Sequence, residues 1–306
     1  MGGGRRSWPP PCSSPSVTSK DAGIFLGLKA ADSGYADAAA VVVPVPYEQT
    51  VSYGAGTARG PAAILEASGY VELYDEVLGE EPWRKGIHTA AEVSPHDDPE
   101  TFQTKLRERA SSLIADGKFP VFLGGEHSLT AAPVQAARDA YEDLSVLQLD
   151  AHADLREEYH GTRRSHASVM RRVHELGVPV VPVGIRAVSP EEIEFIRSHD
   201  LPVFWSHRIA HGDEWMETAL SALTDTIYLT FDVDFFDPSL VPATGTPEPG
   251  GGLWHETMRF LGHVFREKRV IGMDVVELAP IAGLHAPDFV VARLVYRTIG
   301  YRLHDW

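Results

Sequence analysis

Three apolar segments of the sequence each end in a cluster of carboxylate and imidazole side chains, and this pattern narrows what the chain can fold into. The segments are residues 121–127, 146–154 and 227–234. Strands disfavour Asp, and burying a carboxylate without a partner costs several kcal/mol or more. If the apolar segments are buried strands, their ends need a cation, so the sequence predicts a metal cluster there.

The spacing inside the clusters supports metal binding. In an extended chain, residues at i, i+2 and i+4 project to one side and converge. The predicted ligands are two imidazoles and four carboxylates: His127, Asp150, His152, Asp154, Asp232 and Asp234. Six ligands are too many for one tetrahedral zinc site, but they suit two metals that share bridging carboxylates. This oxygen-rich set without a thiolate favours Mn²⁺ over Zn²⁺, although zinc stays open.

Each cluster taken alone also has a purely structural explanation. Asp-Xaa-Asp after a strand is often a helix cap or a turn, and Gly-Gly-Glu-His is compatible with a simple turn. The occurrence of all three clusters directly after apolar segments argues against this explanation. Asp237 differs, because it precedes Pro238 and Asp-Pro is typical of a turn. We therefore expect a structural role for Asp237.

Strand-like segments alternate with amphipathic helical patterns along the chain. The predicted strands are 40–45, 121–123, 146–149, 180–183, 227–231 and 270–275. The predicted helices are 61–68, 99–115, 128–141, 167–176, 190–198, 213–223, 254–267 and 287–301. This alternation, with continuously apolar strands, predicts an α/β fold in which helices cover both faces of a parallel sheet. Ligands of such sheets bind beyond the carboxyl ends of the strands, where all three clusters lie.

The chain of 306 residues is expected to form a single domain over residues 21–306, because nothing resembling a linker follows residue 40. Residues 1–20 are rich in Gly, Pro and Ser and are expected to be a disordered extension without a secretory signal. The extension contains the only cysteine, Cys12, so an intramolecular disulfide is excluded. We expect the protein to be cytoplasmic.

Charge and hydropathy limit the possible partners. The net charge of −16 argues against nucleic acid and anionic membranes, and it is compatible with a cationic substrate. Acidity that serves solubility alone is the simpler alternative. No apolar segment reaches the length of a membrane span.

The sequence resembles a known family, the ureohydrolases of the arginase/agmatinase group. The three signatures are Gly-Gly-Glu-His-Ser at 124–128, Asp-Ala-His-Ala-Asp at 150–154 and Asp-Val-Asp-Phe-Phe-Asp-Pro-Ser at 232–239. Further similar segments are 45–54, 59–64, 245–251 and 273–280. The resemblance implies an arginase-like three-layer α/β/α fold with a central, mostly parallel sheet of about eight strands. It also implies a homotrimer or homohexamer.

The resemblance further implies two Mn²⁺ ions per subunit. One ion would take His127, Asp150, Asp154 and Asp232, and the other would take Asp150, His152, Asp232 and Asp234. A hydroxide shared by the two metals would attack the guanidinium carbon of a small cationic substrate and release urea and an amine.

The remaining catalytic roles are also implied by the resemblance. Asp154 would pass a proton to the leaving amine, and a histidine would exchange protons with solvent. His166, twelve residues after Asp154, is the candidate, and His160 is the rival. Glu277 would pair with the guanidinium, because a carboxylate accepts bidentate hydrogen bonds from a planar cation. Asp274 is expected to face elsewhere.

The segment at residues 155–170 indicates the substrate. It lacks the Ser-Gly-Asn-type loop that arginases carry after the second motif, and it is similar to the agmatinase side of the family. The implied reaction converts agmatine and water to putrescine and urea, in polyamine and putrescine biosynthesis. Guanidinobutyrate, guanidinopropionate and arginine stay open, because they differ only in the tail. Arg163 and Arg164 would favour a carboxylate tail if they faced the site, but we expect a solvated pair.

Two other classes of protein remain as alternatives. A binuclear metallophosphoesterase also uses Asp-Xaa-His, but it usually shows an Asn-His-Asp/Glu signature that residues 125–127 lack. A catalytically weak relative that serves as a regulatory subunit would bind metal without releasing urea.

Overall fold

The computed structural model describes residues 23–96 and 98–306, so the predicted extension at residues 1–20 lies outside the described residues. The strands are β1 (Ala40–Val45), β2 (Ile87–Thr89), β3 (Phe119–Gly124), β4 (Ser145–Leu149), β5 (Val180–Ile185), β6 (Phe204–Trp205), β7 (Thr226–Asp232) and β8 (Arg269–Val276). The α-helices are α1 (Gly60–Ser68), α2 (Pro99–Ala115), α3 (Ala131–Ala140), α4 (Val169–Glu175), α5 (Pro190–Ser198), α6 (Ser206–Ile209), α7 (Glu214–Ala222), α8 (Trp254–Glu267) and α9 (Ala286–Leu303). Short 3-10 helices are η1 (Phe25–Gly27), η2 (Ala30–Asp32), η3 (Thr57–Arg59), η4 (Pro82–Lys85), η5 (His127–Thr130), η6 (His166–Ser168) and η7 (Val233–Phe235).

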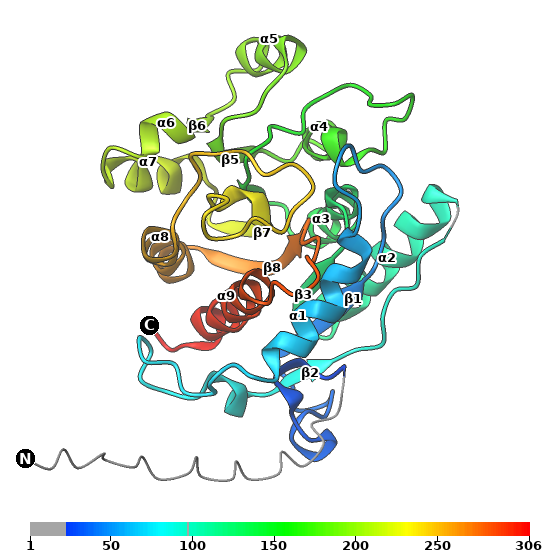
Figure 1. The fold of residues 1–306 in the computed structure, drawn as a ribbon, viewed down its shortest axis with the longest axis vertical. Helices are drawn as coiled ribbons and strands as arrows, with labels where there is room; N and C mark the ends of the chain where they lie inside the picture. The colour runs from blue at the N-terminus through cyan, green and yellow to red at the C-terminus, as the bar shows by residue number, and fades with distance from the viewer. Residues whose placement is uncertain (1–22, 97) are drawn as a thin grey trace, which may run out of the picture.

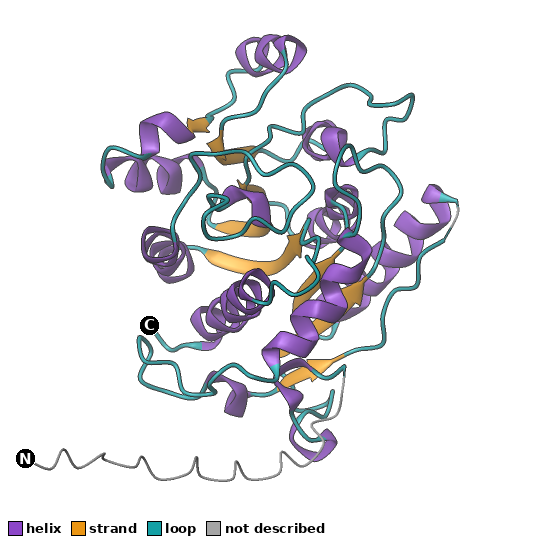
Figure 2. Cartoon of the chain, in the orientation of Figure 1, coloured by secondary structure: helices purple, strands orange, loops and turns teal. Residues whose placement is uncertain are grey.

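The eight strands form one sheet in the order β2-β1-β3-β8-β7-β4-β5-β6. All neighbouring strands run parallel. Helices lie on both faces of this sheet (Figures 1 and 2). The prediction of a three-layer α/β/α fold with a parallel sheet of about eight strands is therefore confirmed.

The central strands are buried on both faces, which explains their continuously apolar sequences. In β1, Val42 belongs to the core that contains Val295 of α9, whereas Val41 belongs to a separate core with Phe102 and Leu106 of α2. Neighbouring residues of a strand point to opposite faces, so each face of β1 has its own helix layer.

The sequence predicted six of the eight strands and missed the two edge strands. β2 and β6 have three and two residues, which is too short for a periodic pattern. All eight predicted helices occur, but the one expected from residue 128 begins at Ala131, after η5. The one expected from residue 167 is divided into η6 and α4.

Local signals explain where several helices begin. The Asp98 side chain accepts a hydrogen bond from the Thr101 amide at 3.0 Å and caps α2. Ser189 and Glu192 form a capping box at the start of α5. Every helix within residues 23–96 and 98–306 is too short or too polar to cross a bilayer.

The order of the strands brings the predicted clusters together at the carboxyl ends of the central strands. β3, β8, β7 and β4 are consecutive neighbours, and residues at or next to their carboxyl ends lie in register: Leu123 with Val275, Val275 with Phe231, and Phe231 with Leu149. The last residue of β7, Asp232, and the segments that follow these four strands carry every side chain predicted to bind metal or the guanidinium. The fold therefore builds the site at the carboxyl ends of its central strands.

Candidate metal centre and active site

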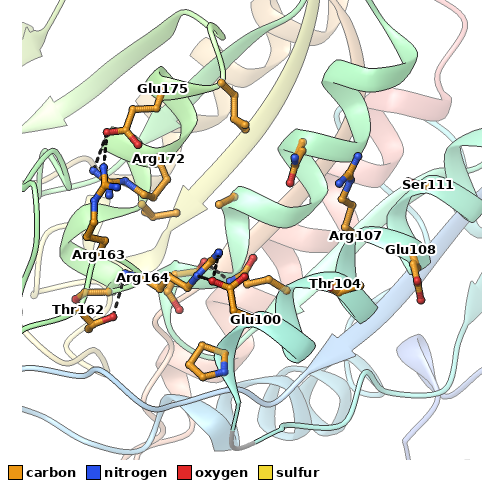
Figure 3. Close-up of a pocket in the computed structure, with 18 of the residues that line it drawn as sticks. Glu100, Thr104, Arg107, Glu108, Ser111, Thr162, Arg163, Arg164, Arg172 and Glu175 are labelled. Carbon is orange, nitrogen blue, oxygen red and sulfur yellow. Dashed lines mark hydrogen bonds and ion pairs between the residues drawn. The ribbon is translucent and has the colours of Figure 1, made fainter.

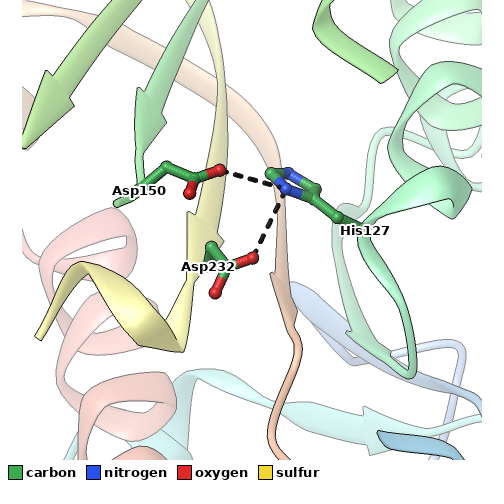
Figure 4. A group of neighbouring side chains, drawn as sticks. All are labelled: His127, Asp150 and Asp232. Atoms are coloured by element: carbon green, nitrogen blue, oxygen red, sulfur yellow. Dashed lines mark ion pairs between the residues drawn. The ribbon is translucent and has the colours of Figure 1, made fainter. Parts of the chain in front are cut away.

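The predicted metal ligands meet beyond β3, β4 and β7. Two groups of side chains are close enough to hold metal ions: His127, Asp150 and Asp232 (Figure 4), and Asp150, His152 and Asp234. Within each group, one ligand atom from each residue lies within 4.8 Å of the others. Asp150 belongs to both groups, so its carboxylate is in position to be shared.

His127 faces three carboxylates inside the protein. Its Nδ1 lies 3.2 Å from Asp150 Oδ2, 3.0 Å from Asp154 Oδ2 and 3.5 Å from Asp232 Oδ2. Only 1% of His127 is exposed, and Nδ1 has no hydrogen-bond partner among the described residues. A nitrogen lone pair and three carboxylate oxygens around one point repel each other unless a cation lies between them. These hard donors therefore fit a divalent cation.

His152 forms the second group with Asp234. Its Nδ1 lies 2.8 Å from Asp234 Oδ2 and 3.8 Å from Asp150 Oδ1. Backbone amides fix the orientation of the carboxylates through Oδ1. Asp234 Oδ1 accepts a hydrogen bond from the Ala151 amide at 2.9 Å. Likewise, Asp232 Oδ1 accepts one from the Asp234 amide at 2.8 Å. Both carboxylates therefore keep Oδ2 directed at a histidine.

Without a bound cation, the buried carboxylates and imidazoles of the cluster shift one another's pKa values in opposite directions. Burial, together with the charges of Asp154 and Asp234, raises the pKa of Asp150 to about 7. Burial disfavours a charged ring at His152, but the carboxylates of Asp234, Asp150 and Asp154 together outweigh burial and raise the pKa of His152 to about 10. Burial also acts to raise the pKa of Asp234, but His152 and the hydrogen bond from the Ala151 amide help to outweigh burial, and that pKa falls to about 2. Bound divalent cations would keep the carboxylates ionised and the rings neutral, as metal ligation requires.

Glu277 reaches the cluster through an unusual backbone conformation. Its φ is 66°, and that of Asp154 is 53°, both in the left-handed region that residues with a Cβ rarely adopt. The Glu277 amide donates to Gly125 O at 2.8 Å, and Glu277 Oε1 accepts from the His127 amide at 2.6 Å. Burial raises the pKa of Glu277 well above its ordinary range, although the His127 amide opposes this shift. A cationic ligand beside Glu277 would restore its ionised form.

A cavity of about 220 Å³ opens beside the cluster. Its lining includes Asp154, Glu277 and His166, and two loops at residues 51–54 and 244–246. The Gly54 amide donates to Gly245 O at 3.1 Å and joins these loops, and a Cβ on Gly54 would lie only 2.9 Å from that oxygen. The volume is below the range of roughly 300–1,000 Å³ for drug-sized ligands, so the cavity suits a small, narrow substrate.

The structure separates the two candidate histidines. His166 lines the cavity, with Nδ1 3.1 Å from Thr50 Oγ1 and Nε2 2.9 Å from Ser52 Oγ. Burial lowers the pKa of His166, so the ring is neutral at physiological pH. His160 is exposed, packs edge-on against Tyr159 and does not belong to the lining of this cavity.

Glu126 organises the loop that holds His166, a role that the sequence did not indicate. Its buried carboxylate accepts hydrogen bonds from the amides of Gln49 and Thr50 at 2.5 and 2.6 Å. It also accepts from Thr50 Oγ1 at 2.8 Å and Ser128 Oγ at 2.5 Å. Gln49 and Thr50 lie more than seventy residues from Glu126 in the sequence, so no local spacing connects them.

Arg163 and Arg164 face away from the metal centre. Arg163 pairs with Glu157 and Glu175, each at 2.9 Å, and Arg164 donates to Glu100 at 2.6 Å. Both arginines line a different cavity, of about 1240 Å³, bordered by α2, α3 and α4 (Figure 3). They form surface ion pairs, and neither belongs to the lining of the cavity beside Glu277.

Asp237 and Asp274 lie outside the ligand groups. Asp237 holds the following loop by accepting from the Ser239 and Gly250 amides at 3.0 and 2.8 Å, as a turn residue would. Asp274 is fully buried behind the centre and accepts hydrogen bonds from two hydroxyl groups of β7.

Comparison with known proteins gives a consistent result. The arginase family matches residues 38–300. The chain is 44% identical to the N(1)-aminopropylagmatine ureohydrolase of Synechocystis sp., covering 90% of this chain and 93% of that protein. It is 35% identical to the agmatinase of Pyrococcus horikoshii, covering 86% and 92%. The crystal structure of the agmatine ureohydrolase of Thermoplasma volcanium superimposes with a TM-score of 0.82 at 30% identity, covering 90% and 94%.

Proposed function

Because the chain belongs to the arginase family and is a ureohydrolase that acts on amidine C–N bonds, we propose that it releases urea from an agmatine-type substrate. Such a substrate has a guanidinium group at one end and a positively charged amine tail. The observation that carries the proposal is the cluster of buried carboxylates and imidazoles beside Glu277, at the base of one small cavity. Agmatine would give putrescine and urea.

We further propose that N(1)-aminopropylagmatine is preferred over agmatine. Three relatives named for that substrate are 42–44% identical to this chain. A fourth, from Thermococcus kodakarensis, is 35% identical, and so is the agmatinase of P. horikoshii. The longer substrate carries a secondary ammonium, and its hydrolysis would give spermidine and urea. Tyr53 lines the cavity and is 86% exposed, so its ring is available for cation–π contact with the tail.

The arginase family depends on a binuclear metal site, and the ligand groups of this chain fit one. We propose two Mn²⁺ ions, one held by His127, Asp150, Asp154 and Asp232, and one held by Asp150, His152, Asp232 and Asp234. When bound, such a pair lowers the pKa of water so that hydroxide is available near neutral pH.

The chain's own residues would bind the substrate and move protons. The carboxylate of Glu277 would accept two N–H groups of the guanidinium and hold its carbon over the cluster. Asp154 would take the proton released by the attacking water and pass it to the leaving amine nitrogen. His166, neutral and held by Thr50 and Ser52, would then exchange protons between the cavity and solvent.

Urea release from Mn²⁺-loaded protein tests this proposal. The substrates to compare are N(1)-aminopropylagmatine, agmatine, arginine and 4-guanidinobutyrate. A higher kcat/KM for N(1)-aminopropylagmatine than for agmatine supports N(1)-aminopropylagmatine as the preferred substrate. A higher kcat/KM for agmatine would make agmatine the preferred substrate. Preference for guanidinobutyrate or arginine would contradict a cationic tail, and absence of urea from all four would contradict the proposed activity.

A further inference from the structure

Asp274 on β8 is a buried carboxylate that the proposed chemistry does not use. It is fully buried, and it forms no ion pair with any described residue. Its partners are hydroxyl groups: Oδ1 accepts from Thr230 Oγ1 at 2.6 Å, and Oδ2 accepts from the Tyr228 hydroxyl at 3.0 Å. A carboxylate without a counterion in a sheet interior is costly to bury, so a role beyond packing is expected for it.

The sheet register places this carboxylate behind a metal ligand. Thr230 and Asp274 are direct cross-strand partners in β7 and β8. Because alternate residues of β7 share a face, Thr230 and Asp232 point to the same side of the sheet. Gly272 leaves room for the Tyr228 ring, since a Cβ at Gly272 would lie 3.2 Å from it.

Thr230 connects Asp274 to His127. Thr230 Oγ1 lies 2.8 Å from His127 Nε2. The hydroxyl has one proton, and an ionised carboxylate only accepts, so Thr230 donates to Asp274 and offers its oxygen lone pair to His127. His127 must then carry its proton on Nε2, which leaves the lone pair of Nδ1 directed at the carboxylates of Asp150 and Asp154.

We propose that Asp274, acting through Thr230, is a positioning residue that fixes the ring orientation and the tautomer of His127 for metal binding. The inference rests on the proposed metal site. It differs from a merely structural role because it predicts a selective effect on one of two metals. Partners that orient a metal-binding histidine typically change metal affinity by about 10- to 100-fold when removed.

Metal titration of the metal-free full-length protein with Mn²⁺, followed by calorimetry, provides the test. Thr230→Val removes the hydroxyl at nearly constant side-chain shape. The affinity for one of the two Mn²⁺ ions should fall by about 10- to 100-fold. Thr230→Ser keeps the hydroxyl and should restore the affinity. Tyr228→Phe is the matched control, because it removes the other hydrogen bond of Asp274 and leaves the connection to His127 intact. Thr230→Ala replaces the valine variant if that variant does not fold.

The outcomes separate this inference from the proposed function. If Thr230→Val binds both ions as tightly as the wild type, or if Tyr228→Phe weakens binding equally, the positioning role is wrong while the ureohydrolase proposal stands. If the wild type binds two ions but releases no urea, the proposed activity fails, and the titration still decides whether the Thr230 connection between Asp274 and His127 positions the ring. A wild type that binds no divalent ion overturns both.

Discussion

Two buried acidic sites of this molecule handle charge in opposite ways. Asp75 is fully buried, and the protein supplies its counterion, because the Arg297 guanidinium of α9 pairs with it directly and Arg293 Nη2 lies 3.7 Å away. At the metal centre, histidines are the only described residues that form ion pairs with the four aspartates. Arg186 lies behind the centre but donates to the carbonyl oxygens of Asp234 and Glu248 at 2.6 and 2.8 Å.

The difference distinguishes a structural charge from a functional one. A buried carboxylate that stabilises the fold has its cation built into the chain, as Asp75 does. A buried carboxylate cluster that the chain leaves without one is prepared for a cation from outside. Removing a charge should therefore have opposite consequences at the two sites, and the following predictions examine this contrast.

The largest effect is expected for Asp150→Asn, at the shared carboxylate. This change removes a direct metal contact. The value of kcat/KM for urea release should therefore fall by more than about 100-fold, the upper end of the loss typical when a residue that only contacts a metal ligand is removed. The metal-free variant should unfold at a temperature no lower than that of the metal-free wild type, since one buried like charge is gone. Calorimetric unfolding and metal analysis measure both, and a strongly destabilised metal-free variant would contradict the contrast.

The opposite result is expected for Arg297→Met. Loss of this cation leaves Asp75 buried and poorly compensated, so the free energy of unfolding should fall by about 3–5 kcal/mol while two metals still bind. Arg259→Met is the control, because Arg259 pairs with Asp213 on the surface and should contribute less than about 1 kcal/mol. Equal effects of the two arginines in chemical denaturation would show that Asp75 does not depend on its counterion.

A smaller effect is expected for His166→Asn, which changes the cavity without touching the ligand groups. Loss of a general acid–base residue should lower kcat by about 10²-fold with unchanged metal content. His160→Asn, at the exposed rival, should leave kcat within about twofold of the wild type. A larger loss at His160 than at His166 would reverse the assignment made from the cavity lining.

The smallest effect concerns pH. Burial lowers the pKa of His166, and only the neutral ring accepts a proton, so activity should rise as pH passes through that lowered value. The acidic limb of the kcat/KM profile should therefore lie below the ordinary histidine pKa of about 6.5. His166→Asn should remove this acidic limb. If the limb persists unchanged in the variant, it arises from the titration of another group.

The sequence predicted those parts of the site that depend on local spacing. Asp150, His152 and Asp154 lie two residues apart, and this spacing singled them out as candidate ligands. The extended alternation expected for them does not occur, because β4 ends at Leu149 and the φ of Asp154 is 53°. The parallel sheet followed from continuously apolar strands, whereas β2 and β6 were too short to give a pattern.

Long-range contacts were not predictable in the same way. The hydrogen bond of Thr50 to Glu126 spans 76 residues, and that of Thr50 to His166 spans 116. The connection from Asp274 to His127 depends on the register of β7 with β8, which no segment of the sequence reveals by itself. Sequence patterns therefore predicted the groups proposed to bind, and the structure was needed to propose the groups that position them.

Anomalous diffraction at the manganese edge, from crystals of the Mn²⁺-loaded protein, would test the central claim most directly. The account predicts two peaks about 3.5–4 Å apart, one beside His127 Nδ1 and one beside His152 Nδ1, with Asp150 between them. A single peak, or peaks remote from these side chains, would contradict the view that this carboxylate cluster is completed by two external cations.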